Sequence, residues 1–166
     1  MNKDKTTRII TIIAIIILSI TFDQVSKIIV RNTISYHENI KVIGEYFTLT
    51  KVENTGAFLS LGSQIPKAVY YILMVLLPVC VIGYAFYYLL TKQNLSKAII
   101  IGISLVIGGG IGNIIDRVLF GSVTDFMYMD FVIFHTGVFN IADNCVMAGM
   151  AFILFDMFIN KKKNNQ

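Results

Sequence analysis

The chain has 166 residues, of which 55% are hydrophobic and 14% are charged, and its mean hydropathy is +0.71. Soluble domains carry roughly 25% charged residues, so a chain this apolar cannot cover a water-soluble surface. The net charge of +4 does not indicate nucleic-acid binding, because the basic residues cluster at the ends of apolar runs instead of forming a basic stripe. The composition predicts a single integral-membrane domain over residues 1–166.

Four apolar runs are long enough to cross a membrane as helices, since a hydrocarbon core of roughly 30 Å needs about 20 helical residues. They cover residues 9–30, 68–90, 98–115 and 137–159. No small-x-small cleavage site follows the first run, and apolar residues resume at Ile28, so we expect this run to stay attached. The sequence predicts an all-α polytopic membrane protein with four transmembrane helices.

Two connections between these runs are predicted to lie outside the cytoplasm, at residues 32–66 and 118–136. Residues 40–52 of the first connection are rich in Val, Ile, Tyr, Phe and Thr, and Gly44 is a turn candidate, so we expect a small β-sheet there. Pro66 stands just ahead of the second run, a favourable position for a helix to begin.

The distribution of Lys and Arg predicts the orientation. With both termini and the connection between the second and third runs in the cytoplasm, eight of the 14 basic residues lie inside. Cytoplasmic loops carry the excess of Lys and Arg, so this orientation is favoured.

Polar side chains recur at the outer ends of three predicted spans, where charged groups are costly and usually functional. They are Asp23, Gln24 and Lys27 in the first span, Asn113, Asp116 and Arg117 in the third, and Asn140, Asp143 and Asn144 in the fourth. Asp23 and Lys27 are four residues apart and can pair on one helix face. Such groups could simply hold the helices together, but the convergence of three helix ends favours a site.

No residue pattern predicts a metal or another cofactor. Cys80 and Cys145 both lie within apolar runs and are expected to be small buried hydrophobic residues. His37 and His135 are isolated from any second ligand. The glycine-rich run at residues 108–112 predicts close helix packing, because neither a preceding strand nor a following Gly-Lys-Ser/Thr supports a phosphate site.

Five short segments, taken in order, resemble the signature segments of the lipoprotein signal peptidase (signal peptidase II) family. They are Asp23–Lys27, Asn54–Phe58, Gly109–Arg117, Val123–Phe126 and Phe139–Asp143. Each is weak alone, but five in matching order, spacing and membrane position form a specific pattern that covers most of the chain.

The resemblance implies a four-helix membrane fold with a small extracytoplasmic sheet and an aspartic endopeptidase of the bacterial cell membrane. The implied reaction removes the signal peptide from diacylglyceryl-modified prolipoproteins by cleavage before the lipidated cysteine. Asp125 and Asp143 are the implied catalytic pair, without a metal or another cofactor. The substrate-binding or dyad-supporting positions implied are Asp23, Lys27, Asn54, Gly56, Asn113, Arg117, Asn140 and Ala142. The resemblance further implies a monomer with its site near the outer face, in contact with membrane lipids and open to globomycin-like cyclic lipopeptide inhibitors.

The residues alone select Asp143, an ionisable group among asparagines, but they do not distinguish Asp125 from Asp130 as its partner. Two carboxyl groups that share one proton can act together as base and acid. One alternative is a small proton- or ion-coupled transporter, which usually has polar residues at mid-membrane depth or inverted repeats. Another is a structural subunit of a membrane assembly, in which Asp125 and Asp143 would be dispensable.

Overall fold

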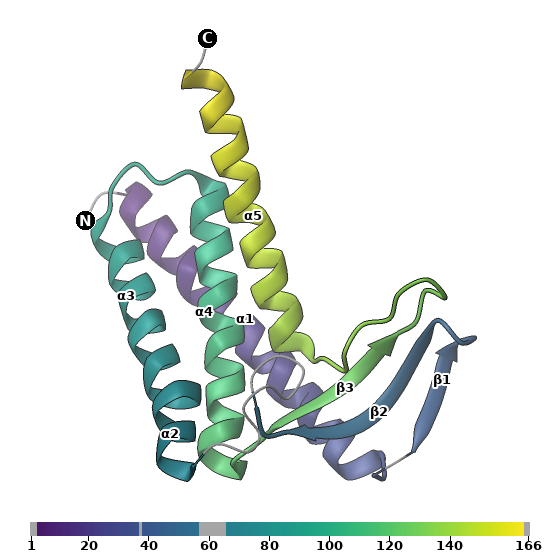
Figure 1. Cartoon of the computed structure of the whole chain (residues 1–166). Helices are drawn as coiled ribbons and strands as arrows, with labels where there is room; N and C mark the ends of the chain where they lie inside the picture. The colour runs from purple at the N-terminus through teal and green to yellow at the C-terminus, as the bar shows by residue number, and fades with distance from the viewer. Residues whose placement is uncertain (1–2, 37, 57–65, 165–166) are drawn as a thin grey trace.

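Four membrane-length helices form the body of the protein (Figure 1). The structure, a computed structural model, describes residues 3–36, 38–56 and 66–164. The helical elements are α1 (Lys3–Thr33), α2 (Lys67–Tyr71), the π-helical turn η2 (Ile72–Leu76), α3 (Leu77–Thr91), α4 (Lys97–Phe120) and α5 (Ile141–Asn164). Within the described residues, the helices apolar and long enough to cross a membrane are Lys5–Thr33, Lys67–Thr91, Lys97–Phe120 and Ile141–Ile159. The predicted four-helix membrane fold is confirmed.

The second span is built from α2, η2 and α3 in succession. Pro66 directly precedes it, as the sequence predicted. Pro78 has no N–H to donate to the carbonyl of Met74, and the chain takes the wider π turn over the residues just ahead of it.

Among the helix ends that differ from the predicted spans, two concern the polar residues. Helix α4 continues five residues past the predicted end and stops at Gly121, whose φ of 75° gives a left-handed cap. Helix α5 begins at Ile141 instead of residue 137. Asp116 therefore lies inside a helix, whereas Asn140 precedes one.

A three-stranded antiparallel sheet extends to one side of the helices (Figure 1). Its strands are β1 (Asn39–Ile43), β2 (Phe47–Asn54) and β3 (Val123–Met129), in the order β1-β2-β3. Gly44, with a φ of 52°, lies in the turn between β1 and β2, as predicted. Strand β3 falls in the connection predicted only as a loop; its pairing places Val52 opposite Asp125.

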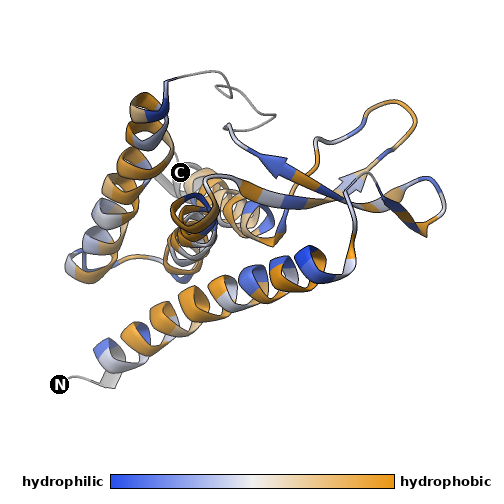
Figure 2. Cartoon of the chain, turned by 90° about the horizontal axis from the view of Figure 1, so that it is seen from below, coloured by the Kyte–Doolittle hydropathy of each residue, from blue (hydrophilic) through white to orange (hydrophobic). Residues whose placement is uncertain are grey.

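Two apolar clusters hold these elements together. Ile12, Leu89 and Ile107 join α1, α3 and α4. Val30 and Phe126 belong to a second cluster, which fixes the end of α1 against β3. Elsewhere the helices keep their apolar side chains on the outside, and Figure 2 shows them largely in the hydrophobic colour. This distribution suits a protein whose solvent is lipid.

Glycines allow α4 and α5 to pack backbone against backbone. A Cβ atom added at Gly102 would lie 2.7 Å from the carbonyl oxygen of Gly149, and one added at Gly149 would lie 2.5 Å from the carbonyl oxygen of Gly102. A Cβ atom added at Gly109 would likewise collide with the carbonyl oxygen of Ala142. The predicted packing role of the glycine-rich run is thus seen at Gly109, which lies against the start of α5.

We expect Gly102→Ala to destabilise the protein by about 1 to 3 kcal/mol, because the added methyl group overpacks the α4–α5 contact. Gly83→Ala is the matched control, since nothing lies within 4 Å of its added Cβ. Thermal unfolding of the detergent-purified variants measures the difference. Equal melting temperatures for the two variants would contradict the proposed contact.

Candidate active site

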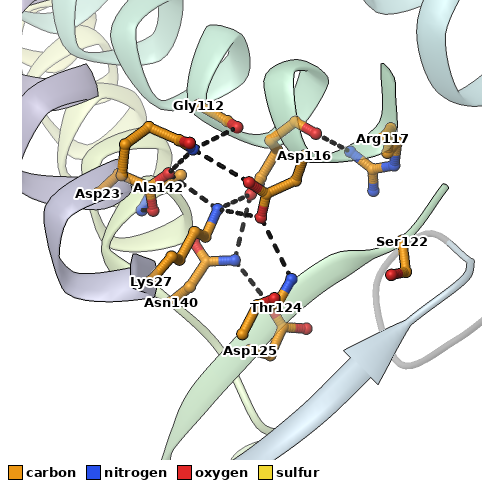
Figure 3. A network of polar contacts seen from close by, with 12 residues as sticks. Asp23, Lys27, Gly112, Asp116, Arg117, Ser122, Thr124, Asp125, Asn140 and Ala142 are labelled. Carbon is orange, nitrogen blue, oxygen red and sulfur yellow. Dashed lines mark hydrogen bonds and ion pairs between the residues drawn. The ribbon is translucent and has the colours of Figure 1, made fainter. Parts of the chain in front are cut away.

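Polar side chains from three helices and one strand meet near the sheet-side ends of the helices (Figure 3). Asp23, Lys27, Asp116 and Asn140 have no exposed surface at all. Burial of charged groups is costly unless each has a partner. The contacts of these groups therefore determine what the site can do.

Lys27 lies between two buried carboxylates. Its Nζ is 2.8 Å from Oδ2 of Asp23, the pair predicted from their spacing, and 3.1 Å from Oδ2 of Asp116. Arg31 contributes a second cation, with Nη2 at 3.0 Å from Oδ1 of Asp116. The amide of Gln24 donates to both carboxylates at 3.1 Å. Two anions are thus balanced by two cations in a network that joins α1 to α4; we call these five residues the ion cluster.

The ion cluster holds the first turn of α5. Oδ1 of Asp23 accepts a hydrogen bond from the backbone N–H of Ala142 at 2.9 Å. Ala142 directly precedes Asp143, so this contact fixes the backbone beside that aspartate. The role of Ala142 is carried by its backbone and by its close packing against α4.

The ion cluster holds the start of β3 in the same manner. Oδ2 of Asp116 accepts from the backbone N–H of Thr124 at 3.2 Å, and Arg31 Nε donates to the Thr124 hydroxyl at 2.9 Å. Thr124 directly precedes Asp125. Each aspartate of the predicted pair therefore follows a residue whose N–H is bound by a carboxylate of the cluster (Figure 3).

Asp143 forms a reciprocal capping arrangement with Asn140 at the start of α5. The backbone N–H of Asp143 donates to Oδ1 of Asn140 at 2.9 Å, and the backbone N–H of Asn140 donates to Oδ2 of Asp143 at 3.2 Å. This is a capping box, and it explains why the helix begins after Asn140. Asn113 completes the environment by donating its amide to Oδ1 of Asp143 at 2.8 Å. The positive end of the helix dipole favours a negative charge here.

Asp125 is 2% exposed on β3 and receives amide donors on both carboxyl oxygens. Asn140 donates to Oδ1 at 2.6 Å, and Asn54 donates to Oδ2 at 3.0 Å. The side chain of Asn140 therefore touches both aspartates. Burial raises the pKa of Asp125 to about 6, and the negative charge of Asp143 adds to the rise. The hydrogen bonds from the two amides lower this pKa but do not cancel the rise.

Asp130 lies at the other end of the sheet and has a different role. Its Oδ1 accepts the backbone N–H of Val132 at 2.9 Å in the turn after β3. The geometry therefore groups Asp125, and not Asp130, with Asp143. That is the choice that the residues alone left open.

Arg117 and Gly56 join the other predicted site residues. Arg117 Nη2 donates to the carbonyl of Gly56 at 3.2 Å, and the Gly56 N–H donates to Oδ1 of Asn54 at 3.0 Å. Asn113 Oδ1 accepts from Lys27 at 3.0 Å and from Asn140 at 3.1 Å. All ten site residues that the family resemblance implied thus belong to one connected network.

Sequence reasoning gave no role to Arg31 and Thr124, and it counted Asp116 among the convergent polar residues without assigning it a partner. Asp116 carried a signal, as a charged residue in an apolar run, but its partners come from elsewhere in the chain. Among the described residues, no group of three or more His, Cys, Asp or Glu side chains is placed to hold a metal ion.

In the described part of the chain, four apolar membrane-length helices and a cluster of buried ionisable groups between α1, α4, α5 and β3 define a multi-pass membrane protein with an enzyme-like site. Its fold resembles a bacterial membrane enzyme solved by the in meso method at 2.3 Å resolution, with a TM-score of 0.83, 26% identity and coverage of 92% of this chain and 90% of the other. A second such enzyme, solved at 1.9 Å, gives a TM-score of 0.77 at 28% identity, covering 89% and 92%.

The family model for signal peptidase (SPase) II matches residues 15–159. A lipoprotein signal peptidase of Borrelia hermsii is 34% identical over 99% of both chains. Those of Streptococcus thermophilus and Geobacter sulfurreducens are 36% and 30% identical, each over 90% of this chain and 92% of the relative. The chain therefore belongs to the signal peptidase II family and is a peptidase.

We expect Lys27→Met to destabilise the protein by about 3 to 5 kcal/mol, because it leaves two buried carboxylates short of a cation. Adding Asp23→Asn removes one of those charges and should restore part of the loss. Lys41→Met is the control, since Lys41 pairs with Glu45 at the exposed surface, where such pairs contribute little. Unfolding in detergent measures all three; a Lys27→Met protein as stable as the control would show that the pairing is dispensable.

The raised pKa of Asp125 predicts a pH-dependent cost of folding. The carboxyl has its ordinary value of 3.8 in the unfolded chain and about 6 in the folded one, so the folded state binds the proton more tightly. Stability should therefore fall as pH rises from about 4 to about 6, by up to about 3 kcal/mol, and then level off. Asp125→Asn lacks this titration, so its melting temperature relative to the parent should rise over that interval. A constant difference from pH 4 to pH 7 would contradict the shift.

Proposed function

We propose that the protein is an aspartic endopeptidase of the bacterial cell membrane that removes the signal peptide from diacylglyceryl-modified prolipoproteins, cleaving before the lipidated cysteine. The observation that carries the proposal is the Asn140 side chain, which binds both Asp125 and the backbone of Asp143. The family's relatives named lipoprotein signal peptidase support the substrate class.

The different surroundings of the two aspartates support different roles. Asp143 accepts N–H donors at a helix N-terminus, which suits a carboxylate that acts as a base. Asp125, with its pKa raised to about 6 by burial, is suited to carry the shared proton near neutral pH. Asp143 would thus be the general base and Asp125 the general acid.

In the proposed reaction, Asp143 removes a proton from a water molecule as the water oxygen attacks the scissile carbonyl carbon. Asp125 donates its proton to the carbonyl oxygen, and a neutral tetrahedral diol forms. The C–N bond then breaks as Asp143 returns its proton to the leaving nitrogen. Asp125 recovers a proton from the diol hydroxyl, so the pair ends in its starting state.

Arg117 is placed to contact the substrate beside this pair. It donates to the carbonyl of Gly56, and its buried Nε has no hydrogen-bond partner among the described residues. A buried donor of this kind is available to a peptide carbonyl. We assign Asn54 and Asn113 to holding the carboxyl groups in place, since each donates its amide to one of them.

The location of the pair supports a lipidated substrate. With both termini in the cytoplasm, the site lies near the outer face of the membrane, where a diacylglyceryl group can keep its chains in lipid. Each buried methylene contributes about 0.8 kcal/mol, so two chains can hold a peptide at that depth. No observation favours a transporter, because the polar network is confined to the last third of α1, the last turns of α4, the first turn of α5 and β3.

Asp125→Asn and Asp143→Asn should each lower the cleavage rate by at least about a hundredfold, because an amide cannot exchange the proton. The double variant should lose no more than either single one, since the two act as a unit. Asp130→Asn, at the turn after β3, should retain most activity. The assay is the mass shift of a diacylated prolipoprotein incubated with purified enzyme, run beside its unlipidated precursor.

Two results would be decisive against the proposal. An active Asp125→Asn with an inactive Asp130→Asn would mean that the wrong aspartate has been chosen. Activity in both Asp125→Asn and Asp143→Asn would remove the aspartic mechanism itself. Equal cleavage of lipidated and unlipidated precursors would refute the lipid requirement alone.

A further inference from the structure

The turn after β3 displays four consecutive apolar side chains that no other part of the described structure covers. Phe131, Val132, Ile133 and Phe134 are 43%, 84%, 94% and 62% exposed. They carry no charge, and we call them the apolar tip. Exposed apolar groups of this density usually mark a contact surface.

Most backbone N–H groups of the apolar tip form hydrogen bonds within the turn. The N–H of Phe131 donates to the carbonyl of Phe134 at 2.9 Å, and that of Ile133 donates to the carbonyl of Phe131 at 2.7 Å. The N–H of Val132 donates to the side chain of Asp130 at 2.9 Å. Three successive donors are therefore satisfied without water. A loop that enters a water-poor region needs this, because an unpaired N–H there costs several kcal/mol.

Val132, within the apolar tip, has an unusual backbone conformation. Its φ of 69° is rare for a β-branched residue. The Asp130 side chain holds its N–H, and the bridge between Asp130 and His135 closes the loop behind it. Strained backbone of this kind persists where the surroundings enforce it, and it often marks a functional position.

The loop lies level with the start of a membrane-length helix. In Figure 1 the connection between β3 and α5 curves back from the sheet and reaches the level of the first turns of α5. The helix Ile141–Ile159 is itself one of the membrane-length segments. In Figure 2 the same connection, at the edge of the molecule away from the helices, is drawn largely in the hydrophobic colour.

We propose that the apolar tip inserts its side chains among the acyl chains of the membrane leaflet nearest the sheet, with its backbone at the boundary between head groups and acyl chains. Lipid is the occupant because the tip is uncharged, three of its four backbone N–H groups are satisfied, and it lies level with the first turns of a membrane-length helix. The insertion anchors the far end of β3, while the ion cluster holds the near end through Thr124. The strand that carries Asp125 is then fixed at both ends, one by protein and one by lipid.

The chain contains no tryptophan, so a single introduced one reports its own surroundings. Ile133→Trp tests the apolar tip. Phe155→Trp, 62% exposed on α5, is the lipid-facing reference, and Glu45→Trp, whose native side chain is 79% exposed, is the water-facing reference. Each is placed in phosphatidylcholine vesicles with brominated acyl chains, and its quenching by bromine and by aqueous iodide is measured. Phe134→Trp repeats the test if Ile133→Trp does not fold.

We expect the tryptophan at the tip to behave like Phe155→Trp, with strong quenching by brominated lipid and weak quenching by iodide. Quenching like that of Glu45→Trp would overturn the proposal. Protection that disappears when the protein is diluted in lipid would mean that a second copy covers the tip, and this too would overturn it. So would protection that requires added prolipoprotein. None of these readings depends on catalysis, so the proposed function can fail or stand independently.

Discussion

The position of Lys27 between Asp23 and Asp116 is the interaction on which the rest of the site depends. All three side chains are fully buried, where water cannot screen their charges, so each is tolerated only because the others are present. The two carboxylates also bind backbone N–H groups of α5 and β3. One buried ion pair network thus joins two helices within the membrane to the two segments that carry the aspartates.

This arrangement separates the groups that hold the site from the groups proposed to react. The ion cluster is internally balanced, and it acts on Asp125 and Asp143 mainly through the residues before them. The aspartates are left to asparagine amides, which position a carboxyl without a counter-ion. A full cation in direct contact would favour the ionised form of Asp125, whereas the present surroundings raise its pKa to about 6. A fixed polar environment of this kind suits proton transfer without rearrangement.

The sequence predicted what local chemistry controls and missed what pairing at a distance controls. The four spans follow from the bilayer's demand for long apolar helices, and the Asp23–Lys27 pair follows from helical spacing. Strand β3 was missed because the strand that it pairs with along its length, β2, lies more than 60 residues earlier. Asn140 was wrongly predicted to lie within the fourth span. It caps α5 instead, through reciprocal hydrogen bonds with Asp143 that the apolar pattern does not reveal. The role of Asp116 was missed because its partners come from α1 and β3.

The register of the small sheet has a consequence for how this protein becomes active. Asp125 faces Asn140 because β2 and β3 pair with Val52 opposite Asp125 and Asn54 opposite Val123, after a shift in register beyond Leu49. Side chains alternate along a strand, so a slip of one residue would turn Asp125 to the other face and present Thr124 or Phe126 instead. A chain with such a slip would still have four inserted helices and nearly the same helical content. Four inserted helices therefore do not by themselves assemble the site, which also requires β2 and β3, from opposite sides of α2–α4 in the sequence, to pair in this register.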